Sequence, residues 1–68
     1  MNERERIGRR IAEIRESKGL TVRDLADMTG INYANVSKIE HGKYNVGIDI
    51  LSRIAEALDC SIEIVNCD

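Results

Sequence analysis

A row of polar side chains between residues 33 and 38 is the part of this 68-residue chain best suited to chemistry. If the segment is helical, Val36 and Ile39 point together into a core and leave the opposite face polar. That face carries Tyr33, Ala34, Asn35, Ser37 and Lys38. Donors, acceptors and an aromatic ring near a helix N-terminus can contact base edges in the major groove of double-stranded DNA. The alternative is an ordinary solvated amphipathic helix.

Two short helices joined by a tight turn would position this row. Thr21 followed by Asp24 is a helix N-cap pattern, because a hydroxyl and a carboxylate can satisfy the free amides of a helix start. Gly30 lies where the chain must reverse direction, and glycine adopts a left-handed conformation at little cost. Asn32 would cap the second helix. Residues 21–42 are therefore predicted to form a helix-turn-helix, which favours base contact over simple solvation.

The chain resembles the repressor-type (Cro-like, XRE-like) helix-turn-helix family of bacterial and phage regulators over about residues 7–60. The resemblance is carried by the segments IGRRIAEIRESKGLT, DLADMTGI, VSKIEHGK and ILSRIAEALDCS, whose combined spacing is specific. It implies a sequence-specific DNA-binding transcriptional regulator, a homodimeric repressor on a palindromic operator. Val22 departs from the family, which usually has a phosphate-contacting glutamine at this position.

The resemblance also implies roles for residues outside the polar row. Arg15 matches a position that forms a buried or half-buried ion pair with Glu40, and this pair would tie the first helix to the end of the third. The loop after the third helix lies along the phosphate backbone in the family, and its side chains here are Lys43, Tyr44 and Asn45. Thr21 and Asn32 are expected to hold phosphates as well. An ordinary solvated loop is the alternative for residues 43–45.

Length and charge predict one small domain, residues 1–68, that gains from a partner subunit, since so short a chain buries little surface. A net charge of −2 at first argues against nucleic acid. However, residues 1–45 hold nine Lys/Arg against seven Asp/Glu, whereas residues 46–68 hold one against five. The acidic part of the sequence therefore lies away from the predicted DNA-contacting helix.

The expected fold class is all-α, with four helices and a short C-terminal dimerising β-strand. The first helix is predicted over residues 3–17, the fourth over residues 48–58 and the strand over residues 61–66. One strand cannot stand alone, so we expect it to pair with a second copy, as in the antitoxins that partner kinase-like toxins. The predicted dimer interface is Ile48, Ile50, Ile62, Ile64 and Val65. A tail that folds back or frays, leaving a monomer, is the alternative.

No catalytic, metal or cofactor site is expected. Cys60 and Cys67 are too few for a structural metal site, and His41 is the only histidine. We predict that Cys60 packs in the core, that Cys67 is an exposed tail thiol, and that both are reduced in a cytoplasmic protein. No stretch is long enough to span a membrane.

Three functions compete at this point. The first is a homodimeric repressor that binds double-stranded DNA and regulates its own operon. The second is an antitoxin that neutralises a protein toxin and also autoregulates its operon. The third is a helical domain that mediates protein contact alone, which would make the face from Tyr33 to Lys38 dispensable for DNA binding.

Overall fold

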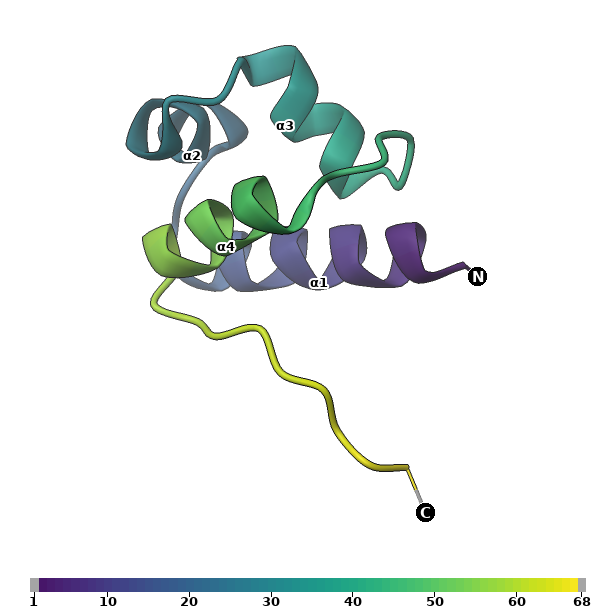
Figure 1. The fold of residues 1–68 in the computed structure, drawn as a ribbon. Coiled ribbons are helices and arrows are strands. Elements are labelled where there is room, and N and C mark those ends of the chain that lie inside the picture. The colour runs from purple at the N-terminus through teal and green to yellow at the C-terminus, as the bar shows by residue number, and fades with distance from the viewer. Residues whose placement is uncertain (1, 68) are drawn as a thin grey trace.

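Helix starts and stops follow the capping residues of the sequence. The computed structural model describes residues 2–67, and its helices are α1 (Glu3–Ser17), α2 (Val22–Thr29), α3 (Tyr33–Glu40) and α4 (Ile48–Ala57) (Figure 1). The Asn2 side chain accepts a hydrogen bond from the Glu5 amide at 2.9 Å, which caps α1. Helix α4 ends one residue before the prediction, because Leu58 is its C-cap. Residues 1 and 68 of the predicted domain lie outside the described residues.

The turn between α2 and α3 has the predicted geometry. Gly30 has a φ of +70°, in the left-handed region, and its amide donates to the Ala26 carbonyl at 2.9 Å. A side chain would strain this conformation, whereas glycine adopts it freely. The chain can therefore end one helix and begin the next within three residues, Gly30, Ile31 and Asn32.

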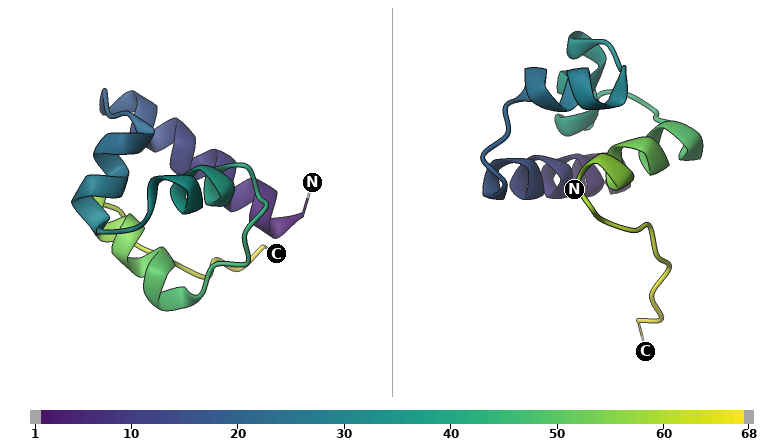
Figure 2. Two further views of the ribbon diagram at one scale, coloured as in Figure 1. Left: turned by 90° about the horizontal axis from the view of Figure 1, so that it is seen from above. Right: turned by 90° about the vertical axis from the view of Figure 1, so that its left-hand side faces the viewer.

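The helices form two layers around one apolar core. In Figure 1, α2 and α3 lie above α1 and α4, and Figure 2 shows the same arrangement from two further sides. Helix α3 packs against α1 and α2, and α2 also packs against α4. The buried core consists of Ile11, Leu25, Ala26, Val36, Ile39, Ile54 and Leu58. Helix α3 is thus held on its inner side and leaves its outer side free.

A glycine allows α1 to approach the end of α3 closely. A Cβ added at Gly8 would overlap the carbonyl oxygen of Ile39 and lie 2.7 Å from that of Glu40. Both partners are backbone atoms, which cannot move aside as a flexible side chain can. Gly8 therefore fixes where the C-terminal half of α3 sits on α1.

The strand predicted over residues 61–66 is not present. After α4 the described residues of the tail adopt neither helix nor strand and run away from the helices (Figure 1). The physical reason is that a strand needs a second strand to receive its hydrogen bonds, and no other described segment forms one with it. The fold seen in this chain is therefore a four-helix all-α domain with an irregular tail.

The apolar residues assigned to a dimer interface differ in exposure. Ile48, Ile64 and Val65 are largely exposed, and Ile64 has a relative exposure of 102%. Ile62 is also exposed, but Ile50 is half-buried and packs against the core. Cys60 is half-buried against the same core and Cys67 is exposed.

Candidate nucleic-acid interface

The residues on the polar face of helix α3 differ in how exposed they are to solvent. The Asn32 side-chain oxygen accepts the Ala34 amide at 2.8 Å, which caps the helix and leaves the Asn32 amide group able to donate. On the inner side Val36, Ile39 and Glu40 are buried. Among the predicted base-contacting residues, Tyr33, Ala34 and Lys38 are exposed, whereas Asn35 and Ser37 are half-buried. Ala34 and Lys38 are one turn apart and therefore lie on one stripe.

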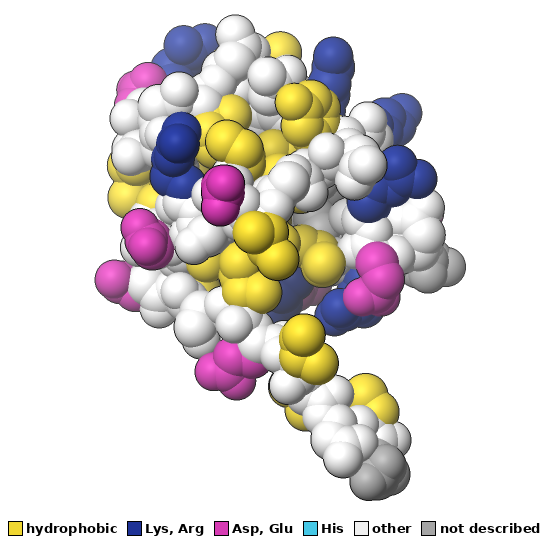
Figure 3. All heavy atoms as spheres, in the orientation of Figure 1, with side chains coloured by type: hydrophobic (Ala, Val, Ile, Leu, Met, Phe, Trp, Pro, Cys, Tyr) yellow, Lys and Arg dark blue, Asp and Glu magenta, His cyan; other side chains and the backbone are white. Residues whose placement is uncertain are grey.

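The loop after α3 begins directly beside this stripe. Gly42 has a φ of +71°, and the Lys43 amide donates to the Lys38 carbonyl at 2.9 Å, so the backbone of Lys43 is fixed to the last turns of the helix. In Figure 3, the Lys and Arg side chains at the upper right, over α3 and this loop, have no acidic side chains among them. This is the charge pattern that a phosphate backbone requires.

The half-buried side chains of Asn35 and Ser37 are less open to a ligand than those of Tyr33, Ala34 and Lys38. The stripe of Ala34 and Lys38 is therefore the part of α3 that a large partner can reach most directly.

Tyr44 and Asn45 occupy a different environment from Lys43. Both are exposed, yet they also line a shallow hollow of about 100 Å³ with Ile7 and Val46, between the loop, α1 and α4. Tyr44 therefore has one side on the protein and the other in solvent. Of the three loop side chains, Lys43 is the one that is not among the residues lining this hollow.

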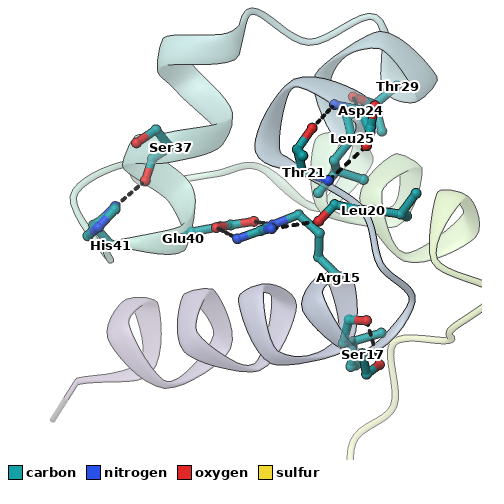
Figure 4. Close-up of polar contacts among 11 residues, drawn as sticks. Arg15, Ser17, Leu20, Thr21, Asp24, Leu25, Thr29, Ser37, Glu40 and His41 are labelled. Atoms are coloured by element: carbon teal, nitrogen blue, oxygen red, sulfur yellow. Dashed lines mark hydrogen bonds and ion pairs between the residues drawn. The ribbon is translucent and has the colours of Figure 1, made fainter.

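The start of α2 is held by a reciprocal capping box (Figure 4). The Thr21 hydroxyl accepts the Asp24 amide at 3.0 Å, and the Asp24 carboxylate accepts the Thr21 amide at 2.8 Å. The hydrogen bonds from the Thr21 backbone and hydroxyl lower the pKa of Asp24.

Arg15 and Glu40 form a two-pronged ion pair beneath α3 (Figure 4). Arg15 Nε donates to Glu40 Oε2 at 2.7 Å, Nη2 donates to Oε1 at 3.0 Å, and Nη1 donates to the Leu20 carbonyl at 2.8 Å. The Arg15 side chain is 12% exposed and that of Glu40 is 5% exposed. The hydrogen bond to Glu40 raises the pKa of Arg15 further above its usual value. The pair therefore joins α1, the segment before α2, and α3, away from the outer stripe.

Two contacts beside the stripe were not predicted from the sequence. The guanidinium carbon of Arg23 lies 4.9 Å from the centroid of the Tyr33 ring. His41 Nδ1 donates to the Ser37 carbonyl at 2.7 Å and closes the end of α3. The four-residue spacing of Ser37 and His41 could have indicated the second contact, whereas no spacing rule joins Arg23 to Tyr33.

Neither a metal-binding cluster nor a membrane-spanning helix is found among the described residues. Within residues 2–67, no three side chains from His, Cys, Asp and Glu are placed to share a metal ion. None of the helices in the same range has both the length and the apolar composition needed to span a bilayer.

Known proteins resemble this chain in sequence and in structure. A model of the helix-turn-helix family HTH_3 matches residues 11–65. The competence pilus inhibition repressor of Acinetobacter baylyi is 34% identical over 56 residues, which are 82% of this chain and 51% of that protein. The chain spans about half or less of the length of the curated relatives that it matches.

Two solved structures share the fold. The restriction-modification controller protein C.AhdI of Aeromonas hydrophila has a TM-score of 0.84 and 32% identity, covering 87% of this chain and 89% of its own. A chain of the HipA-HipB-O2-O3 complex has a TM-score of 0.85 over 100% of this chain and 96% of its own. Its identity is 20%, so that likeness concerns the fold alone.

Proposed function

Because this chain belongs to the helix-turn-helix family HTH_3, we propose that it acts as a homodimeric transcriptional repressor on a palindromic operator. The domain is a DNA-binding domain of the kind found in transcriptional regulators. The observation that carries the proposal is the exposed stripe of Ala34 and Lys38 on α3, with Lys43 fixed beside it. An exposed helix face that carries one lysine, with a second lysine fixed beside it, suits contact with base edges in the major groove and with the phosphates that flank it.

Base contacts are assigned first to Lys38, which is the exposed cation of the stripe. Ala34 offers a methyl group, and Tyr33, Asn35 and Ser37 offer polar groups at its edges. The alanine variant Lys38→Ala should lose about 1–3 kcal/mol of operator affinity and relax the preference at particular base pairs. Lys18→Ala is the matched control, since Lys18 is an exposed lysine at the C-cap of α1, in the other layer. If the two variants have equal operator affinity and base preference, the result would favour a domain that mediates protein contact alone.

Phosphate contacts are assigned to Lys43, Tyr44 and Asn45, with the Thr21 hydroxyl and the Asn32 amide at the starts of α2 and α3. The side chains of Lys43, Tyr44, Asn45 and Asn32 can donate hydrogen bonds, and donors of this kind fix a protein on the DNA backbone without reading sequence. Lys43 is the strongest of these assignments because it carries a positive charge and does not line the hollow that Tyr44 and Asn45 share.

We assign the dimer interface to the tail and to the apolar surface next to it. A cavity of about 220 Å³ lies open between α1, α4 and the start of the tail. Most of its lining residues are apolar, Ile54 and Ile62 among them, and Arg6, Arg10 and Glu63 also line it. Ile64 and Val65 extend beyond it and are largely exposed. Burying them against a second copy would remove apolar surface from water and give the tail a pairing strand. Ile48 adds to this surface, whereas Ile50 contributes less because it already packs against the core.

Symmetry restricts how two tails can pair. The two-fold axis of a symmetric antiparallel pair is perpendicular to the sheet, so it maps each face of the sheet onto itself. Ile62 and Ile64 are two residues apart and share one face, and the same residues of the second copy must lie on that face too. Val65 lies on the opposite face. One face of the paired strands therefore gathers four isoleucines.

This arrangement gives a matched pair of variants. Ile64→Lys and Val65→Lys both introduce one charge at an exposed residue, so neither should disturb the folding of a single chain. Ile64→Lys should convert the dimer to a monomer in sedimentation experiments and lower operator affinity, and Val65→Lys should weaken the dimer less. Deleting residues 61–68 should also give a monomer. A truncated chain that still sediments as a dimer would place the interface on the helices alone.

An antitoxin is the second candidate function. It is favoured by the exposed apolar tail, which could bind a foreign protein in place of a second copy, and by the fold shared with a chain of the HipA-HipB-O2-O3 complex. Co-expression with the product of the adjacent gene tests it. A stable complex that Ile64→Lys abolishes would support the antitoxin, and failure of the two chains to co-purify would exclude that product as the toxin.

A further inference from the structure

We infer that Arg23 binds a DNA phosphate and that the ring of Tyr33 holds its guanidinium in place for that contact. This inference rests on the proposed function, since it concerns the same DNA interface. The guanidinium carbon lies 4.9 Å from the centre of the ring, within the distance at which a cation is attracted to an aromatic face. Arg23 is in the first turn of α2 and Tyr33 is the first residue of α3. The contact therefore joins the starts of the two helices of the motif.

The charge of Arg23 is available to a ligand. Arg6, Arg10 and Arg15 each have a carboxylate partner, but in the described part of the chain no carboxylate lies within 4.0 Å of Arg23. The Asp24 carboxylate accepts a hydrogen bond from the Thr21 amide instead. Stacking on a ring occupies the flat face of a guanidinium and leaves its N–H groups, which lie in the plane, free to donate. Those donors match the oxygens of a phosphate in pairs.

The stack also changes the role expected of Tyr33. Arg23 covers one face of the ring, although the tyrosine is still 47% exposed. A ring held in this way supports the arginine from the side of α3, and so we assign Tyr33 as a positioning residue instead of a base-contacting one. An arginine held before DNA arrives loses less conformational freedom on binding than a free side chain does. The ring, and not the hydroxyl, is the part of Tyr33 that this role requires.

The test compares the effect of Arg23→Ala in three backgrounds. Operator affinity is measured with and without this substitution in the wild type, in Tyr33→Phe and in Tyr33→Ala. We expect a loss of about tenfold in the wild type and in Tyr33→Phe, because a charged hydrogen bond is removed in both. In Tyr33→Ala the loss should fall to about twofold or less, since the arginine is no longer held. An equal loss in all three backgrounds would overturn the positioning role.

A second measurement separates phosphate from base contact. Arg23→Ala should weaken binding to all duplex sequences alike and reduce the slope of log affinity against log salt concentration by about 0.9. A relaxed preference at one base pair would overturn the phosphate assignment. Wild-type protein that selects no duplex at all would refute the proposed function and this inference together. Wild-type protein that binds an operator while Arg23→Ala binds it equally well would refute this inference alone.

Discussion

Glu40→Ala is expected to destabilise the fold strongly. The Glu40 carboxylate is 5% exposed and takes two hydrogen bonds from Arg15, at 2.7 and 3.0 Å. Its removal leaves a nearly buried guanidinium whose other partner is the Leu20 carbonyl. A buried charge left unpaired in this way costs about 3–5 kcal/mol of unfolding free energy. Since each kcal/mol shifts the Tm of a small domain by about 4–8 °C, thermal melting followed by circular dichroism should show a fall of at least about 12 °C.

The exposed pair of Arg6 and Glu3 is the matched control. Its closest distance is also 2.7 Å and its residue types are the same, but its side chains are 62% and 74% exposed. Glu3→Ala should therefore melt close to the wild type, because water and salt screen an exposed pair. Below its Tm, Glu40→Ala should keep the wild-type base preference, since the pair lies beneath α3. If the two variants melt alike, burial does not strengthen the Arg15–Glu40 pair and the expected destabilisation is wrong.

Three further outcomes can be measured on the same protein. Gly8→Ala should lower the unfolding free energy in urea by about 1–3 kcal/mol through overlap with the carbonyls of α3. Gly47→Ala meets open space and should lower it less, because only the preference for glycine over alanine at the N-cap of α4 is lost. The depressed pKa of Asp24 means that its contribution to stability is full above its unfolded pKa of about 3.9 and disappears as the pH falls through the folded value. The Tm difference between wild type and Asp24→Asn should therefore shrink below about pH 4, and a constant difference would show that the charge is irrelevant. Lys43→Ala should flatten the salt dependence of DNA binding by about one unit for each phosphate that is no longer bound, and an unchanged slope would remove Lys43 from the backbone contacts.

Local patterns in the sequence predict the helices well. The caps at Asn2 and Thr21 depend on side chains three residues away, and the turn at Gly30 depends on one residue. Helical spacing likewise identifies Val36 and Ile39 as core residues, and both are buried. These features need no knowledge of distant parts of the chain, because the interactions that create them are made within one helical turn.

Contacts between distant residues are less accessible to sequence reasoning. Arg15 and Glu40 are 25 residues apart, and only the resemblance to a family pointed to their pairing. The close approach at Gly8 and the stack of Arg23 on Tyr33 depend on how two helices cross, which neither helix encodes alone. The alternation of Ile62 and Ile64 with Glu63 predicts the two faces of a β-strand. A strand also needs a partner strand, which the described part of the single chain does not supply, and so its tail is irregular.

Sequence-specific binding by a symmetric dimer can be tested by letting the wild-type chain select from a pool of random DNA duplexes and sequencing what it retains. We predict enrichment of an inverted repeat whose half-sites are centred about one helical turn, roughly 34 Å, apart, as two copies of α3 on a two-fold axis require. The same selection with Lys38→Ala should retain that spacing with a relaxed preference within each half-site. Enrichment of a single half-site without symmetry would contradict the dimer, and recovery of the starting pool would contradict sequence-specific binding itself.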